Sequence, residues 1–65
     1  MYEYDIMLRA PNGALKPLMM GYNSYEEAEE DMKALCHLSP SGYVYDDGGW
    51  IWDVCIEPRP VYYEV

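Results

Sequence analysis

The chain has 65 residues, 51% of them hydrophobic and 15% aromatic, and twelve acidic against four basic residues give a formal net charge of -8. This length allows one folded domain over residues 1–65, since such a chain buries only about 60% of its unfolded surface. The charge argues against direct binding of DNA or RNA, because neutralising phosphates requires the opposite sign, and against anionic membrane surfaces. No apolar run reaches the roughly 20 residues of a membrane span.

The two cysteines, Cys36 and Cys55, are too few for the dense disulfide framework of small secreted domains. No basic segment followed by an apolar stretch has the pattern of a signal peptide. We therefore expect a reduced protein in the cytoplasm. The alternative is a single disulfide that joins the predicted helix to a strand.

The first predicted strand covers residues 2–9, where apolar and polar side chains alternate with the period of a half-buried strand. The apolar face holds Tyr2, Tyr4, Ile6 and Leu8. The polar face holds Glu3, Asp5 and Arg9.

A hairpin turn is predicted at residues 11–13. Pro11 presets the backbone for a turn, and Asn12 and Gly13 both tolerate the positive φ that tight hairpins require. In the return strand, residues 15–22, Pro17 cannot donate to a ladder, which indicates an edge strand or a bulge. The side chains expected on one face of this strand are Leu18, Met20 and Tyr22.

A helix is predicted to begin after Ser24, which has the features of an N-cap, with Glu27 three residues later completing a capping box. Glu29 and Lys33 form a favourable i,i+4 pair. We place His37 in the last turn, where a cation suits the helix dipole, and Pro40 prevents any continuation. The apolar stripe that should face the sheet is Tyr25, Ala28, Met32, Leu35 and Cys36.

A second hairpin follows, with strands over residues 43–45 and 50–57 around the turn at residues 46–49. We expect Pro58-Arg59-Pro60 to break the second strand, and residues 61–65 to form a fifth short strand that pairs within the monomer or with a second copy. The core is predicted to come largely from one face of the second strand, which holds Trp50, Trp52, Val54 and Ile56. The expected fold class is α+β: an antiparallel sheet of four to five strands with one helix on one face, in the order β-β-α-β-β(-β).

None of the reactive side chains forms a recognisable catalytic or metal-binding pattern. The lone His37 is expected to cap the helix, and Cys36 and Cys55 to be small buried hydrophobic residues. One histidine and two cysteines nineteen positions apart match no zinc motif. Asp46-Asp47-Gly48-Gly49 lacks the alternating oxygen ligands of a calcium loop and is interpreted as a turn. We predict no enzyme activity, no cofactor and no metal.

Acidic residues are concentrated in the predicted helix, where Glu26, Glu27, Glu29, Glu30 and Asp31 fall within six consecutive positions. One interpretation is an ordinary solvated face whose first-turn acids complement the helix dipole. The other is that these carboxylates, together with Asp46 and Asp47, mimic a row of phosphates and bind a basic protein surface. Tyr62 and Tyr63 are candidate contacts for the same partner, because tyrosine is enriched at interfaces.

The Ser-Tyr-Glu-Glu-Ala-Glu-Glu helix start between two hairpins, in a short chain rich in tyrosine and acid, resembles small accessory proteins of bacteriophages. Some anti-restriction, anti-CRISPR and glycosylase-inhibitor proteins of this kind are acidic mimics of DNA. The resemblance implies an inhibitor that binds a basic host protein, such as a CRISPR or restriction effector, in the host cytoplasm. The alternative is a small homo-oligomeric or assembly-associated protein, with a homodimer formed by strand exchange, whose acidity only provides solubility.

Overall fold

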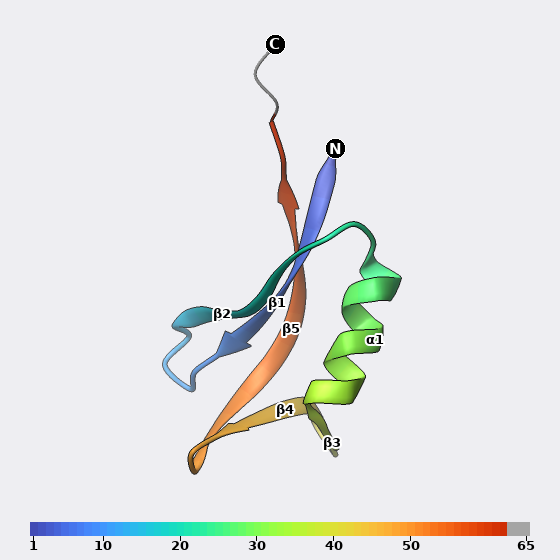
Figure 1. Cartoon of the computed structure of the whole chain (residues 1–65). Coiled ribbons are helices and arrows are strands. Elements are labelled where there is room, and N and C mark those ends of the chain that lie inside the picture. Colours follow the sequence, from blue (N-terminus) through green and yellow to red (C-terminus); the bar gives the residue numbers. More distant parts are fainter. Residues whose placement is uncertain (63–65) are drawn as a thin grey trace.

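The computed structural model describes residues 1–62 and shows an α+β fold with a five-stranded antiparallel sheet and one helix (Figure 1). The expected fold class is therefore confirmed at this level. The elements in chain order are β1 (Tyr2–Arg9), β2 (Leu15–Tyr22), α1 (Tyr25–Leu35), β3 (His37–Ser39), β4 (Gly42–Asp47) and β5 (Trp50–Pro60).

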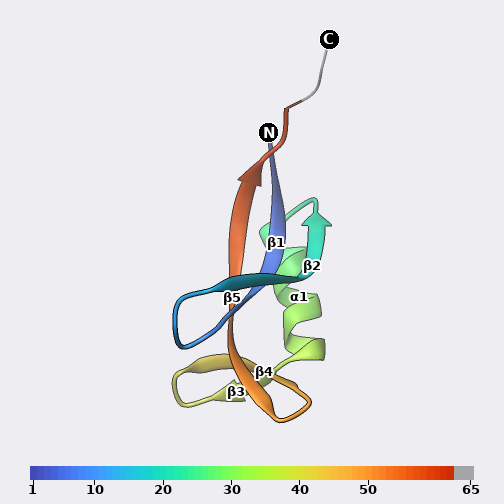
Figure 2. The same cartoon turned by 90° about the vertical axis from the view of Figure 1, so that its left-hand side faces the viewer.

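The strands lie in the order β2-β1-β5-β4-β3, so the first and last strands of the chain pair at the centre of the sheet. Their register runs without interruption from Tyr2 opposite Pro60 to Arg9 opposite Asp53. The two strands stand side by side over most of their length in both views (Figures 1 and 2). This long-range pair joins the β1–β2 hairpin to the consecutive antiparallel strands β3, β4 and β5.

The core lies between α1 and the sheet, because the buried stripe of the helix contacts β1. Ala28, Met32 and Cys36 form one buried cluster with Ile6 of β1. Leu8 is also fully buried but lies outside this cluster. The half-buried side chains packed against the cluster are Tyr4, Leu18, Tyr22, Tyr43, Tyr45, Val54 and Ile56.

Strand β2 is an edge strand with two irregularities in its pairing to β1, as Pro17 indicated. The register shifts between Tyr4 and Ile6 and again between Ile6 and Met7, which inserts extra residues on the β2 side. Each bulge changes the face to which the following side chains point. Met20 is consequently exposed whereas Leu18 and Tyr22 pack on the core, and the prediction that the three lie on one face is wrong.

The β1–β2 turn forms where it was predicted, but only Gly13 has a positive φ, of 87°. Asn12 contributes its side chain instead: its Oδ1 accepts a hydrogen bond of 2.9 Å from the backbone N–H of Ala14. The β4–β5 turn consists of Gly48 and Gly49, with φ of 61° and 97°. Positive φ at both central positions is the geometry that two-residue hairpins with the twist of a sheet require.

Helix α1 begins as predicted, with the Ser24 hydroxyl accepting a hydrogen bond of 3.2 Å from the backbone N–H of Glu27. It ends at Leu35, so His37 is not in its last turn but opens the short strand β3. The apolar stripe is buried at Ala28, Met32 and Cys36, whereas Tyr25 and Leu35 at its ends are exposed.

Strand β5 continues through the two prolines that were expected to break it, and that prediction is wrong. The N–H of Val61 donates to the carbonyl of Met1 at 3.0 Å, which shows that odd-numbered residues of this strand point their backbone groups at β1. Since successive residues of a strand point their backbone groups to opposite sides, Pro58 and Pro60 lack N–H groups only on the side away from β1. There, β4 pairs only with positions 50–53, so no ladder bond is lost.

The remaining strand predictions also need correction. The strand that was not predicted is β3, at residues 37–39. The extra strand was expected in the tail at residues 61–65, but β5 ends at Pro60, before that segment. Of that tail, residues 63–65 lie outside the described part of the chain. The predicted tryptophan core is wrong as well: Trp50 is 75% exposed and Trp52 is half-buried, while Val54 and Ile56 of the same face do pack on the core.

Candidate functional site

The acidic residues of α1 lie mostly on the side of the helix that faces away from the sheet. Glu26, Glu27, Glu30 and Asp31 are exposed, and Glu29 is half-buried. The helical period places Glu26 above Glu30, opposite the stripe that holds the buried Ala28 and Met32. Glu27 lies above Asp31 on the adjacent flank of the helix. The structure therefore brings four carboxylates together on one exposed face, which we call the acidic face of α1.

Two carboxylates of α1 have partners within the molecule. Glu29 pairs with Lys33 at 3.6 Å, as predicted from their spacing. Asp31 accepts a hydrogen bond of 2.7 Å from the Tyr22 hydroxyl at the end of β2. Burial, reinforced by this hydrogen bond, raises the pKa of Tyr22 to about 12. Within residues 1–62, no ion pair involves Glu26, Glu27 or Glu30.

All four basic side chains of the protein are held by its own carboxylates. Arg9 lies 3.8 Å from Glu57, and Lys16 lies 3.2 Å from Asp47. Lys33 pairs with Glu29, and Arg59 pairs with two acids of β1. The unopposed charge of the surface is consequently acidic, and α1 holds its largest group.

Asp46 and Asp47 do not join the acidic face of α1. They end β4 at the tight turn, which lies at the lower left in Figure 1, away from α1 on the right. Asp46 Oδ1 accepts a hydrogen bond of 2.9 Å from the N–H of Gly49, and Asp47 is paired with Lys16. Both carboxylates therefore have local structural partners.

Tyr62 is 88% exposed just beyond the end of β5, and Tyr63 lies outside the described residues. The thiols of Cys36 and Cys55 are both free. Burial raises the pKa of each, which lowers the fraction of reactive thiolate at neutral pH. In the described part of the chain, no three His, Cys, Asp or Glu side chains are grouped to hold a metal ion.

A charged cluster that the sequence analysis missed joins β1 to β5. Asp5 is only 4% exposed, and its two oxygens accept hydrogen bonds from Arg59, at 2.9 Å from Nε and 3.3 Å from Nη2. Arg59 Nη2 also donates to Glu3, and the N–H of Gly21 donates to Asp5 Oδ1. The hydrogen bonds from Arg59 hold the pKa of Asp5 below its usual range. Alternation placed Asp5 on the polar face, but nothing local indicated Arg59 as its partner.

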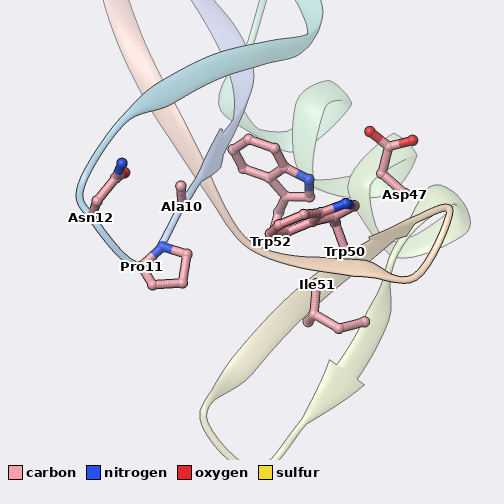
Figure 3. A pocket seen from close by; sticks show the side chains of 7 residues that line it. All are labelled: Ala10, Pro11, Asn12, Asp47, Trp50, Ile51 and Trp52. Carbon is pink, nitrogen blue, oxygen red and sulfur yellow. The ribbon is translucent and has the colours of Figure 1, made fainter.

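The second missed feature is a hollow of about 510 Å³ between the β1–β2 loop and the β4–β5 turn. Figure 3 shows the rings of Trp50 and Trp52 on the same side of β5, with residues 10–12 of the β1–β2 loop facing them. The full lining is Ala10, Pro11, Asn12, Asp47, Trp50, Ile51 and Trp52. We call this the tryptophan hollow.

Lys16 borders the tryptophan hollow and makes two contacts there. Its Nζ lies 5.0 Å from the centroid of the Trp52 ring and 3.2 Å from Asp47 Oδ2. The Trp52 Nε1 atom is closed to solvent and has no hydrogen-bond partner among the described residues. The sequence contained one sign of this site, the pair of tryptophans two positions apart, which we assigned to the core.

Comparison with known proteins gives no relative: no protein-family model, no curated protein and no solved structure matches this chain. Within residues 1–62, no helix is long and apolar enough to cross a membrane.

Proposed function

We propose that this protein is a non-enzymatic protein-binding inhibitor of the phage accessory type. In this proposal the acidic face of α1 blocks the basic surface of a nucleic-acid-processing host protein, such as a CRISPR or restriction effector. The observation that carries the proposal is the charge arrangement. Every Lys and Arg is paired internally, so nothing in the described chain neutralises Glu26, Glu27 or Glu30.

The density of charge on α1 supports a surface that imitates nucleic acid. Four exposed carboxylates fall within residues 26–31, and at about 1.5 Å of rise per residue this is about one charge per 2 Å of helix axis. Duplex DNA carries about one charge per 1.7 Å of its axis. A groove that binds phosphates therefore meets a similar linear density of charge on this helix.

Repulsion between these carboxylates destabilises the isolated helix, and this favours a functional role for the acidic face. Glu26 with Glu30, and Glu27 with Asp31, are like-charge i,i+4 pairs, and each destabilises a helix by about 0.2–0.5 kcal/mol. The helix dipole offsets part of this for the first-turn residues Glu26 and Glu27. Binding to a cationic groove would remove the repulsion at all four positions.

The test begins with capture of partners from bacterial lysate on the immobilised protein, followed by elution with competing duplex DNA and mass spectrometry. Affinity for each purified partner is then measured for the wild type and for the quadruple variant Glu26→Gln, Glu27→Gln, Glu30→Gln, Asp31→Asn. The asparagine introduced at position 31 still offers an acceptor to Tyr22. We expect binding to weaken about tenfold or more, with a shallower salt dependence, since each exposed ion pair contributes about 0.2–1 kcal/mol.

A charge-matched pair of double variants separates the acidic face from the net charge. Glu26→Gln with Glu30→Gln and Asp46→Asn with Asp53→Asn both remove two negative charges, and the asparagine introduced at position 46 keeps an acceptor for Gly49. Only the helix variant should lose affinity. Equal losses of affinity in the two double variants would show that binding depends on net charge alone. Unchanged affinity in the quadruple variant would refute the proposal.

A further inference from the structure

Trp50 and Trp52 of the tryptophan hollow lie on the same apolar face of β5 as Val54 and Ile56, but beyond the part of that face that α1 covers. Val54 and Ile56 of that face pack on the core beneath α1, whereas Trp50 and Trp52 stand past it, and Trp50 is 75% exposed. Leaving a tryptophan in water forgoes about 1.5–3 kcal/mol of burial. Pro11 and Ala10 face the rings across the hollow and add apolar surface (Figure 3).

Lys16 shows which chemistry this site accepts. Its ammonium group lies over the face of Trp52 and against the carboxylate of Asp47 at the same time. An aromatic ring beside a carboxylate attracts a cation through both the ring quadrupole and the full negative charge. Trp50 lines the same hollow, and within residues 1–62 no cation lies over its ring.

We propose that the tryptophan hollow binds an arginine or lysine side chain of a partner protein, with the cationic head between the Trp50 ring and Asp47. The aliphatic stem of that side chain packs on Pro11 and Ala10, in the way that long basic side chains bury their methylene groups. Charge complementarity selects this occupant, because the protein has a net charge of -8 and its own cations are all paired. A ligand that needs a hydrogen bond from Trp52 is disfavoured, since Nε1 is closed to solvent.

This site is separate from the acidic face of α1. The segments that line the hollow, the β1–β2 loop and the β4–β5 turn, lie on the left in Figure 1 and α1 lies on the right, and Glu26 and Glu30 of α1 point away from the sheet. The inference therefore does not depend on the proposed function, and each can fail alone.

The two tryptophans are the only ones in the chain and report on the site directly. The probe is a short acetylated peptide with two arginines, compared with a peptide in which neutral citrulline replaces each arginine, while the two indole N–H resonances are followed by NMR. We expect the arginine peptide to shift the Trp50 resonance and the citrulline peptide to leave it unchanged. Equal shifts from both peptides, or stronger binding of a polyproline peptide, would overturn the proposal.

Variants locate the binding. Trp50→Ala, at an exposed position, should weaken binding of the arginine peptide about tenfold. Tyr62→Ala, the control at another exposed aromatic residue, should leave binding of this peptide unchanged. Lys16→Met removes the internal competitor and should strengthen binding about two- to fivefold.

The last control separates this inference from the proposed function. The variant Glu26→Gln with Glu30→Gln should keep the Trp50 shift. Loss of the shift in that variant would place the peptide on the helix and overturn the inference. A Trp50 shift that grows with protein concentration in the absence of peptide would identify a second copy as the occupant, and would also overturn it.

Discussion

At the scale of single residues, the Asp5–Arg59 pair is the one charged interaction among residues 1–62 in which a carboxylate is removed from solvent. Asp5 lies in the middle of β1 and accepts from Arg59 of β5 and Gly21 of β2, so it links three strands. A carboxylate in this position depends on its partners, because a buried charge without them is strongly destabilising. The exposed ion pairs of Arg9 and Lys33 carry no such penalty.

Asp5→Asn should therefore lower the free energy of unfolding at pH 7 by about 1–2 kcal/mol, since it replaces charged hydrogen bonds by neutral ones. The pKa of Asp5 is lowered in the folded state, so its contribution is fully present above the ordinary value of 3.8 and is lost as pH falls through the folded value. Urea unfolding from pH 7 to pH 2 should show the variant and the wild type converging. Asp53→Asn, at an exposed position, is the control, and a constant difference across this range would contradict the assignment.

The raised pKa of Tyr22 leads to a prediction at alkaline pH. Its pKa is raised to about 12, so its neutral form stabilises the fold fully below pH 10, and this contribution is lost as pH rises through the folded value. Absorbance titration should show a tyrosine ionisation step near pH 12. Tyr22→Phe should remove that late step, and Tyr62→Phe should not. A late step that persists in Tyr22→Phe would assign it to another tyrosine.

At the scale of elements, the parts that could be predicted are those whose signal is local. The Ser24 cap and the Gly48–Gly49 turn each depend on a few adjacent residues, and the structure confirms both. The path of β5 could not be predicted, because prolines are tolerated at positions 58 and 60 only on the side without a pairing strand. The side of β5 that lacks a pairing strand is set by its pairing with β1, which lies almost the whole length of the chain away in sequence.

The same dependence on distant parts of the chain explains why the sequence wrongly assigned the two tryptophans to the core. Alternation correctly grouped Trp50 with Val54 on one face of β5, but the helix that covers this face contacts only part of it. How much of this β5 face is covered depends on where α1 crosses the sheet, and no local sequence pattern specifies that position. The acidic face of α1 could be listed from the sequence, whereas the tryptophan hollow needs the β1–β2 loop beside the β4–β5 turn.

The capped start of α1 gives a prediction at this scale. Ser24→Ala leaves the N–H of Glu27 without its side-chain acceptor and should cost about 1 kcal/mol. For a domain of this size, that corresponds to a fall in Tm of about 4–8 °C. Ser24→Asn, which restores an acceptor, should recover most of it. Thermal unfolding followed by circular dichroism measures the difference, and equal stability of the Ala variant would show that the cap contributes nothing.

At the scale of the whole molecule, the chain is more extended than its length suggests. Its extents are 45 × 24 × 19 Å, and its radius of gyration of 12.6 Å exceeds the value of about 11 Å typical of a compact domain of this length. Few side chains are fully buried, and the described hydrophobic ones are Ile6, Leu8, Ala28, Met32 and Cys36. A surface that binds only the folded state adds stability by an amount set by the partner's concentration and dissociation constant, and this amount is a larger fraction of a small total.

Self-association is one way to gain such a surface, and the edges of the sheet decide whether it happens. The outer edge of β3 is unpaired but only three residues long, which limits pairing with another chain. The two longer edges that are unpaired within residues 1–62 are the outer side of β5 beyond Asp53 and the outer edge of β2. Both carry prolines, at positions 17, 58 and 60, and β2 is also bulged. Proline and bulges are the features by which natural sheets prevent edge-to-edge pairing. We therefore expect a monomer, contrary to the strand-exchange alternative.

The double variant Pro58→Ala with Pro60→Ala tests this protection. It adds two N–H donors to the unpaired side of β5, next to those of Val54 and Ile56, and completes a regular edge. Light scattering should show a mass that rises with concentration for this variant and stays monomeric for the wild type. Pro11→Ala, in the β1–β2 loop, is the matched control and should stay monomeric. A wild type that associates as strongly as the double variant would show that the prolines do not protect this edge, and would favour the homo-oligomeric alternative.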